Sequence, residues 1–460
     1  MRRGPRRAVR TPLFALSLAL HANLTSSLLH HLLATPVGDA ISRNHATATV
    51  AAAGTAAGRR RRARPRPAWH FHGNVSPPGR GQSSTSPRCS VRSGPEVAAA
   101  AAAEGENGGP DAAAAEGRSV GARPAMADAP PLTHDQLPEE SIYLLDGTSM
   151  LFRAFYGRGA GGYLASNGAT EVGAVLAMGI EFAQFINEVK PRYVAMAFDV
   201  GRETTFRRKL YPQYKAQRKP VPLDLTLQIP LAKALSEALG CRTFEMEGYE
   251  ADDVMATLAR QDARAGAWLG WWGRSVGLGV VVCSSDKDMC QLVRDRVHVM
   301  QPRRDGYTIL GSEEVLAKFG VKPSALPDLF GLVGDVADNI PGVKGIGQKG
   351  GSRLLENFET LEGVFAGLDG VGSMGIRGSK GLQALLSQPG IQEEAMLYRE
   401  IATLDDEVPL EGIDAITSST FLYRGASPEA EGVMSALGFH APLRMIQEGS
   451  KRPSARASTV

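Results

Sequence analysis

Three short apolar runs in the middle of the chain are each followed closely by acidic residues. The runs are residues 141–145, 193–198 and 279–283. Because they are continuously apolar rather than alternating, we predict strands that are buried on both faces of a parallel sheet. Between the first and third runs, residues 172–189 and 225–239 have apolar positions at helical spacing, and Pro191 and Gly240 mark the ends of these helices. The alternation of strand and helix predicts an α/β layered domain.

Asp146, Asp199 and Asp286 follow the three predicted strands. Ligands of an open α/β sheet bind beyond the carboxyl ends of its strands. One Asp after a strand usually forms a turn or a helix cap, but three strands with the same ending favour a shared site. Residues 250–253 and 335–338 add five more acids. Capping of the helix predicted at 254–260 accounts for acids in its first turn, but three acids in four residues exceed that need.

Carboxylates gathered at one edge repel one another, and their pKa values rise unless cations are present. The candidate metal ligands are Asp146, Asp199, Glu250, Asp252, Asp253, Asp286, Asp288, Asp335 and Asp338. Oxygen-rich sites of this kind select Mg²⁺ or Mn²⁺. A set of this size suits two cations roughly 4 Å apart, the arrangement that hydrolyses phosphodiesters.

Residues 206–220 form a dense basic cluster in which aromatic side chains lie between the cations. Pro212, Pro220 and Pro222 prevent one uninterrupted helix. Basic residues follow phosphates, and aromatic faces stack on bases, so the cluster favours nucleic-acid binding. A solvated helical face is the alternative, but the cluster lies directly after the second predicted metal-ligand strand.

A glycine-rich stretch at 339–349 is the second candidate for phosphate binding. Gly342, Gly345 and Gly347 permit tight turns whose N–H groups converge on a phosphate. Residues 345–350 also fit the GxGxxG pattern, but no strand precedes them, so we reject a dinucleotide site. Together with the apolar residues that follow, the stretch predicts a helical hairpin that grips a duplex backbone without reading sequence.

Charge is distributed unevenly along the chain. Residues 1–95 hold fifteen Arg, no Lys and one acid. Residues 96–460 therefore hold 36 of the 51 basic residues and 47 of the 48 acidic residues, and their net charge is about −11. A hydrophobic share of 43% excludes a wholly disordered chain, a collagen-like fibre and a polytopic membrane protein. The four Cys include no CxxC pair, so we expect reduced thiols in an intracellular compartment and neither a disulfide framework nor a zinc site.

The Arg-rich, acid-poor start predicts a transit peptide and low-complexity leader over 1–125 and a linker over 126–140, and the composition of 96–135 is typical of disorder. A secretory signal is the rival, because an apolar run at 13–20 follows the first basic residues. That run is too short to span a bilayer, and the acid-free basic character continues well beyond it. A low-complexity tail without a targeting role is the third reading.

Taken in order, six stretches resemble the 5′–3′ exonuclease domain of bacterial DNA polymerase I, within the flap-endonuclease superfamily. They are LLDGTSMLFRAF (144–155), AFDVGRETTFRRKLYPQYKAQR (197–218), GYEADDVMATLA (248–259), SSDKDMCQLV (284–293), GLVGDVADNIPGVKGIGQK (331–349) and YREIATLDDEVPL (398–410). The resemblance implies a PIN-like parallel sheet flanked by helices as the catalytic domain (141–315). It also implies a C-terminal helical, helix–hairpin–helix-type DNA-binding subdomain (316–445), and a flexible tail (446–460) remains.

The resemblance also implies roles for single residues. All nine acids match metal ligands of the family, with Asp253 and Asp338 acting through water. Lys215 and Arg218 are expected to contact and polarise the scissile phosphate, as catalytic residues, in a helical arch. The residues expected to bind DNA are Arg207, Tyr214, Lys215, Arg218, Gly342, Lys344, Gly345, Gly347 and Lys349. A monovalent cation is expected at the glycine hairpin.

The implied activity is that of a 5′–3′ exonuclease and 5′-flap endonuclease with two Mg²⁺ or Mn²⁺ ions. Its expected partners are branched or nicked duplex DNA with a free 5′ end, RNA primers and organellar replication proteins, and we expect a monomer without membrane contact. Too few residues follow for a polymerase domain. We therefore expect a stand-alone form similar to those of plant and algal organelles, which favours a plastid over a mitochondrion.

Three other functions fit parts of the sequence: a DNA-binding module without cleavage, a PIN-class RNase and a small-molecule phosphohydrolase. Departures from the family pattern, including Val336-Ala337 and Gly350-Gly351, weaken the expectation of tight duplex binding but not that of the chemistry. A Trp-rich insertion at 267–279 is read as a surface loop, a partner contact or an error in the gene model.

Overall fold

The computed structural model describes residues 132–450 apart from 139, 158–161, 202, 266–277, 304–305, 376–377 and 411–417. The predicted leader and nearly all of the Trp-rich insertion lie outside the described residues, as do residues 451–460. Among the described residues, no helix has the length and apolar character needed to cross a membrane.

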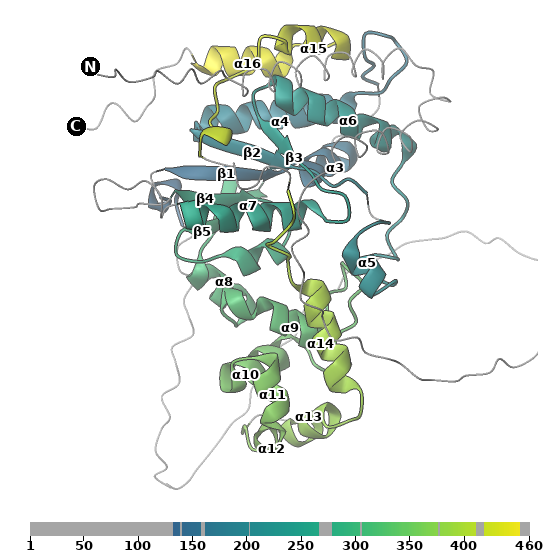
Figure 1. Ribbon diagram of the computed structural model, residues 1–460, viewed down its shortest axis with the longest axis vertical. Helices are drawn as coiled ribbons and strands as arrows, with labels where there is room; N and C mark the ends of the chain where they lie inside the picture. The colour runs from purple at the N-terminus through teal and green to yellow at the C-terminus, as the bar shows by residue number, and fades with distance from the viewer. Residues whose placement is uncertain are drawn as a thin grey trace, which may run out of the picture. The chain divides into compact units, whose positions relative to one another are not determined.

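A six-stranded sheet forms the centre of the fold (Figure 1). Its strands are β1 (Ser141–Asp146), β2 (Tyr193–Ala197), β3 (Arg242–Phe244), β4 (Gly279–Cys283), β5 (Val297–Arg303) and β6 (Gly306–Leu310). The order is β3-β2-β1-β4-β5-β6, and every pairing is parallel except that of β5 with β6. The predicted α/β class is confirmed, and the three apolar runs are the three central strands. β3, β5 and β6 were not anticipated.

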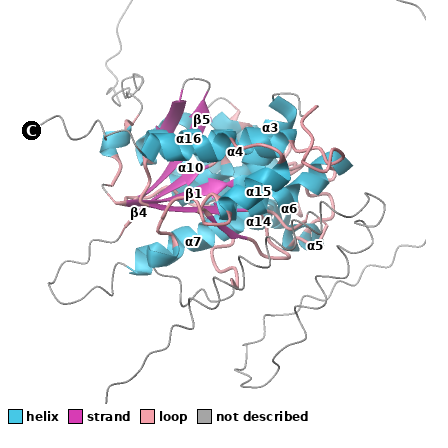
Figure 2. Ribbon diagram, turned by 90° about the horizontal axis from the view of Figure 1, so that it is seen from above, coloured by secondary structure: helices cyan, strands magenta, loops and turns pink. Residues whose placement is uncertain are grey.

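Helices cover both faces of the sheet because both faces of β1 are apolar. Ile142 and Leu144 pack on the side of α7 (Ala251–Ala265), whereas Tyr143 and Leu145 pack on the opposite side. The helices on that opposite side are α3 (Gly147–Gly157), α4 (Gly173–Val189), α6 (Leu223–Ala238), α15 (Ala430–Leu437) and α16 (Ala441–Ser450). Figure 2 shows α4, α6, α15 and α16 gathered together over the strands.

A helical part follows β6. It contains α8 (Ser312–Phe319), α9 (Leu326–Val333), α10 (Gln348–Phe358), α11 (Leu361–Ala366), α12 (Leu368–Val371), α13 (Ser379–Leu386) and α14 (Ile391–Ala402). α14 packs against α9 so closely that a Cβ on Gly331 would lie 2.8 Å from the carbonyl oxygen of Ala395. The core of this part is continuous with that of the α7 face of the sheet.

Three predicted boundaries differ from the structure. The helical part ends with α14, because the chain then returns to the sheet. There Leu422 bridges to Tyr193, α16 packs against α4, and α15 packs against α6. Ile446, placed in the predicted flexible tail, is buried in α16. At the other end, Leu132 of the predicted linker bridges to Ile309 of β6. In each case a short apolar pattern finds a distant partner that composition does not reveal.

Candidate functional site

The three central strands deliver acidic side chains to one edge of the sheet. Asp146 ends β1, and Asp199 and Asp286 follow its two neighbours, β2 and β4. Hydrogen bonds orient the Asp146 carboxylate, since Oδ1 accepts from the Ser149 amide at 2.8 Å and Oδ2 from the Ser284 hydroxyl at 2.8 Å. The local sequence therefore places these groups beyond the carboxyl ends of the strands.

The N-terminus of α7 points at the same edge. The Ala251 amide donates to Asp199 Oδ1 at 2.7 Å, which fixes the first turn of the helix against the end of β2. This contact brings Glu250 and Asp252 beside the strand-end acids. The positive end of the helix dipole favours carboxylates at this position.

The loop after α9 supplies the remaining acids. Gly334 turns the chain with a left-handed φ of 80°, and Asp335 and Ile340 then pair through two backbone hydrogen bonds of 2.8 Å. The tight loop between them carries Asp335 and Asp338. Asp288 approaches from the start of the short 3-10 helix η3 (Asp288–Leu292).

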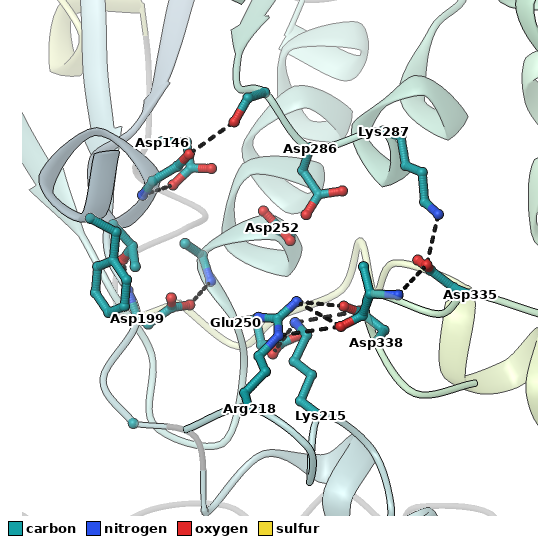
Figure 3. A pocket seen from close by; sticks show the side chains of 17 residues that line it. Asp146, Asp199, Lys215, Arg218, Glu250, Asp252, Asp286, Lys287, Asp335 and Asp338 are labelled. Carbon is teal, nitrogen blue, oxygen red and sulfur yellow. Dashed lines mark hydrogen bonds and ion pairs between the residues drawn. The ribbon is translucent and has the colours of Figure 1, made fainter. Parts of the chain in front are cut away.

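These elements enclose a cavity of about 470 Å³ (Figure 3). Seven of the nine predicted ligands line it: Asp146, Asp199, Glu250, Asp252, Asp286, Asp335 and Asp338. In Figure 3 Asp146 and Asp199 lie on one side of the cavity and Asp335 and Asp338 on the other, with Asp286 between them. The acids therefore converge from segments nearly two hundred positions apart in the chain.

Asp288 does not line the cavity but completes a group of three carboxylates. One oxygen from each of Asp288, Asp335 and Asp338 lies within 4.8 Å of the others. Asp288 Oδ1 is buried and has no hydrogen-bond partner among the described residues. A buried carboxylate oxygen without a donor is costly, and a hard divalent cation would satisfy it. The donor set therefore fits the expected metal.

Burial and mutual repulsion raise the pKa values of several of these acids. Burial is the main cause that raises the pKa of Asp146 to about 6, and the charges of Asp199 and Asp286 add to it. Burial and Asp286 also raise the pKa values of Asp252 and Asp288. The cluster thus holds more negative charge than the protein alone can stabilise, which is the condition under which carboxylates bind cations.

Glu250 behaves in the opposite way. Burial by itself would raise its pKa, but the charges of Lys215 and Arg207 outweigh burial and hold the pKa below its usual value. Glu250 Oε1 accepts from Lys215 Nζ at 2.7 Å, and Oε2 from the Tyr214 hydroxyl at 2.7 Å. Glu250 is therefore ionised and already paired with cations of the basic cluster.

Lys215 and Arg218 lie at the cavity, as expected for the catalytic cations. The backbone of Lys215 is strained, with a left-handed φ of 53°. The Lys215 amide donates a hydrogen bond to the Asp338 carbonyl, which helps to hold this conformation. Arg218 Nη2 donates to Asp338 Oδ1 at 2.7 Å. The segment containing both cations consists of turns between α5 (Phe206–Leu210) and α6 rather than of arch helices, because Pro212, Pro220 and Pro222 interrupt it.

Arg207 and Asp253 are not placed where the sequence suggested. Arg207 was expected to bind DNA, but its side chain is 2% exposed and makes a bidentate ion pair with Asp253, with distances of 2.6 and 2.7 Å. Asp253 was expected to reach a metal, but it is fully buried and faces away from the cavity lining. Each satisfies the charge of the other, so neither is free for DNA or metal.

Tyr214 is also buried rather than available to stack on a base. Its hydroxyl oxygen lies 2.7 Å from Glu250 Oε2 and 2.9 Å from Asp338 Oδ2, so its one proton lies between two acids that reach the cavity from different elements. Burial and these two carboxylates raise the pKa of Tyr214 well above its usual value. Its role here is to position acids.

The glycine hairpin connects α9 and α10 as predicted for a helical hairpin. Gly342 and Gly345 have left-handed φ values of 65° and 101°, and Gly347 caps α10. Lys344 and Lys349 are exposed on this hairpin. A dinucleotide site needs a strand directly before the GxGxxG pattern. Residues 311–344, which lie between β6 and the pattern, are all described and contain no strand, so the rejection of a dinucleotide site is supported.

The sequence reasoning did not select several residues that line the cavity, and Lys287 and Phe152 are two of them. Lys287 lines it and donates to Asp335 Oδ1 at 2.7 Å; its position between Asp286 and Asp288 was the available signal. Phe152 of α3 also lines the cavity, but its apolar character had indicated only a helix core.

The comparisons with known proteins match two consecutive stretches of this chain to one family. Residues 141–320 match the family described as the 5′-3′ exonuclease, N-terminal resolvase-like domain, and residues 321–421 match the 5′-3′ exonuclease, C-terminal SAM fold. The two matches together cover more than half of the chain, so the chain belongs to the 5′-3′ exonuclease family.

Its curated relatives include two bacterial DNA polymerases I. The chain is 31% identical to that of Bacillus subtilis (strain 168) over 317 residues, which are 68% of this chain and 33% of the relative. It is 36% identical to that of Chloroflexus aurantiacus over 275 residues, 59% of this chain and 27% of the relative. The chain thus spans about a third of the length of these proteins.

Solved structures with a similar fold include T5 5′-exonuclease with bound zinc. That protein is 17% identical, and the match covers 68% of this chain and 99% of that chain with a TM-score of 0.43. Flap endonuclease-1 from Methanococcus jannaschii is 14% identical, with 69% and 94% covered and a TM-score of 0.42. The family assignment comes from the sequence matches.

Proposed function

We propose that this protein is a metal-dependent 5′–3′ exonuclease and 5′-flap endonuclease that hydrolyses phosphodiesters of DNA and of primer RNA. The observation that carries the proposal is the single cavity in which seven carboxylates face Lys215, Arg218 and Lys287. Carboxylates of this number suit metal binding, and the cations beside them suit a phosphate. No Ser, Cys or His nucleophile is required.

Asp288, Asp335 and Asp338 would hold one divalent cation, and the acids at the strand ends and at α7 would hold another. Bound Mg²⁺ or Mn²⁺ supplies an activated water and stabilises the leaving oxygen of a phosphodiester. The protein's own contribution is to fix the carboxylates of Asp146 and Asp199 through Ser149, Ser284 and the Ala251 amide before the substrate arrives.

Lys215 and Arg218 are proposed to exchange their carboxylate partners for the scissile phosphate. Their present partners, Glu250 and Asp338, are themselves proposed metal ligands, so a bound metal would replace the cations as counter-charge. The freed ammonium and guanidinium groups would then stabilise the charge that develops on the phosphate.

Duplex DNA is proposed to bind along the glycine hairpin. Lys344 and Lys349 are exposed there and can neutralise backbone phosphates without contacting bases. Left-handed Gly342 and Gly345 let the loop turn tightly, and a monovalent cation is proposed at its carbonyl groups. A branched or nicked duplex with a free 5′ end would then place its junction over the cavity.

The direct test incubates a labelled 5′-flap duplex with Mg²⁺ and compares the wild type with Asp199→Asn. Asn keeps an oxygen acceptor for the Ala251 amide but removes the charge. We expect loss of cleavage by at least two orders of magnitude, with DNA binding retained. Asp369→Asn, at an exposed position of α12, is the matched control and should cleave normally. Equal cleavage by wild type and Asp199→Asn would refute the proposal.

The same substrates separate the alternatives. A binding module without chemistry would bind the flap but leave it intact in Mg²⁺. A PIN-class RNase would prefer single-stranded RNA over flap DNA. A small-molecule phosphohydrolase would show no steep salt dependence of DNA binding. For a protein that binds DNA phosphates, the logarithm of the DNA-binding constant falls linearly with the logarithm of the salt concentration.

We further propose an organellar role in the removal of RNA primers and flaps during DNA replication and repair, in a plastid rather than a mitochondrion. The Arg-rich, acid-poor composition of residues 1–95 supports targeting to an organelle. A fluorescent fusion of the full chain tests it, because a cytosolic or secreted signal would contradict the proposal.

A further inference from the structure

The buried ion pair of Arg207 and Asp253 lies between two helix ends. Asp253 is in the first turn of α7, and Arg207 donates from Nε to the Ile401 carbonyl at 2.8 Å and from Nη2 to the Thr403 carbonyl at 2.9 Å, at the C-terminus of α14. A negative group at a helix N-terminus and a positive group at a C-terminus both match the helix dipoles. The pair therefore joins α7 to α14.

Every polar atom of the pair is satisfied. Arg207 uses its remaining donors on Asp253 and, at 3.4 Å, on Glu250. Asp253 also accepts from the backbone amides of Glu250, at 3.1 Å, and Asp405, at 2.9 Å. A buried ion pair with complete hydrogen bonding defines one geometry, because any shift leaves a buried charge unpaired.

A second side chain holds the same segment. The Gln291 amide donates to the Ala402 carbonyl at 3.1 Å, and its oxygen accepts from the Leu404 amide at 2.9 Å. Gln291 belongs to η3, the 3-10 helix that begins at Asp288. Hydrogen bonds thus hold segment 401–405 to α7 and to η3, two of the elements that carry acids on the sheet side of the site.

The contacts of segment 401–405 are linked to the proposed metal ligands through the helical part. α14 packs against α9, and α9 leads directly into the loop with Asp335 and Asp338. The group of Asp288, Asp335 and Asp338 combines one acid from the sheet side with two from the helical side. Its geometry therefore depends on how the two sides are held together.

We propose that Arg207 and Asp253 are positioning residues that, with Gln291, hold segment 401–405 and so set the spacing of the Asp288–Asp335–Asp338 metal group. The biological meaning of this inference rests on the proposed function, but the inference itself concerns only metal binding. Neither side chain lines the cavity, so their loss should weaken metal binding through the positions of the acids and leave DNA contact unchanged.

The test replaces the pair by apolar residues, Arg207→Met with Asp253→Leu, because removing both charges avoids an unpaired buried charge. Mn²⁺ binding is measured without DNA, by electron paramagnetic resonance of free Mn²⁺. We expect Mn²⁺ binding at the Asp288–Asp335–Asp338 group to weaken at least tenfold. Flap cleavage should fall at low Mg²⁺ and recover at high Mg²⁺, with an unchanged KM for DNA. That metal rescue would not follow from a general structural defect.

Gln291→Ala is the second variant, since it weakens the same segment without touching the ion pair. We expect a smaller loss of Mn²⁺ affinity, about threefold, and Gln388→Ala on the exposed surface is the matched control. If the double variant does not fold, Gln291→Ala decides the question.

Wild-type Mn²⁺ affinity in a folded double variant, or in Gln291→Ala when the double variant does not fold, would overturn the proposal. A salt dependence of DNA binding that becomes shallower by about one phosphate contact in Arg207→Met would also overturn it, because Arg207 would then contact DNA. A wild type that binds Mn²⁺ without cleaving flap DNA would refute the proposed function and leave the metal-binding test valid.

Discussion

Asp146→Asn is expected to make the metal-free protein more stable while abolishing cleavage. Burial raises the pKa of Asp146 from 3.8 to about 6. The folded state therefore holds this proton more tightly than the unfolded state, and the stability that the group contributes falls as pH rises from about 4 to about 6. Above pH 6 the ionised Asp146 opposes folding, and Asn removes that cost.

The magnitude follows from the pKa. A rise of about two pH units, at about 1.4 kcal/mol each, amounts to about 3 kcal/mol at pH 7.5 and to about half of that at pH 5. Asn keeps an acceptor for the Ser149 amide but gives up the hydrogen bond that the Ser284 hydroxyl donates, at a cost of about 1 kcal/mol. The net expectation is a gain of about 2 kcal/mol at pH 7.5 and little change at pH 5.

Urea unfolding in EDTA at both pH values measures this gain, and Asp369→Asn serves as an exposed control that should stay within about 0.5 kcal/mol. Saturating Mg²⁺ should reverse the order, because only the wild type gains the full stabilisation of bound metal. The reasoning would be refuted if Asp146→Asn were less stable than the wild type in EDTA at pH 7.5. It would also be refuted if the gain in the free energy of unfolding were as large at pH 5 as at pH 7.5, because the burial of an ionised Asp146 would then not be the cause.

Further outcomes test other parts of the site. Lys215→Ala should lower kcat for flap cleavage by about 10²- to 10³-fold, as expected when one group that stabilises transition-state charge is lost, and a change in KM alone would contradict this role. Gly342→Ala should destabilise the protein by more than about 1 kcal/mol in urea unfolding, because φ is 65° and the added Cβ would lie 2.3 Å from the Gly334 nitrogen; wild-type stability would refute this reading of the turn. Lys344→Gln should reduce the salt slope of DNA binding by about one, as for one phosphate contact, and an unchanged slope would remove Lys344 from the interface.

The centre of the fold could be read from the sequence because its signals are local. Residues 279–283 are apolar without alternation, a pattern that favours a strand buried on both faces, and they form β4 over Gly279–Cys283. Parallel strands then bring the acids at their ends to one edge whatever the details of packing. The convergence of Asp146, Asp199 and Asp286 was therefore predictable from the strand pattern and the topology rule alone.

The tertiary structure alone decided which charges face the solvent and which face each other. Arg207 stands in a basic cluster that looks exposed in sequence, yet its partner Asp253 lies 46 positions away and buries it. Likewise, the sequence analysis placed Ile446 in a flexible tail, and only the folded chain shows that this residue is buried where α16 packs against α4. The periodicity of the sequence indicates that an apolar side chain is buried. Only the folded chain determines which residues it contacts, because ion pairing and packing act through space between segments that are remote along the sequence.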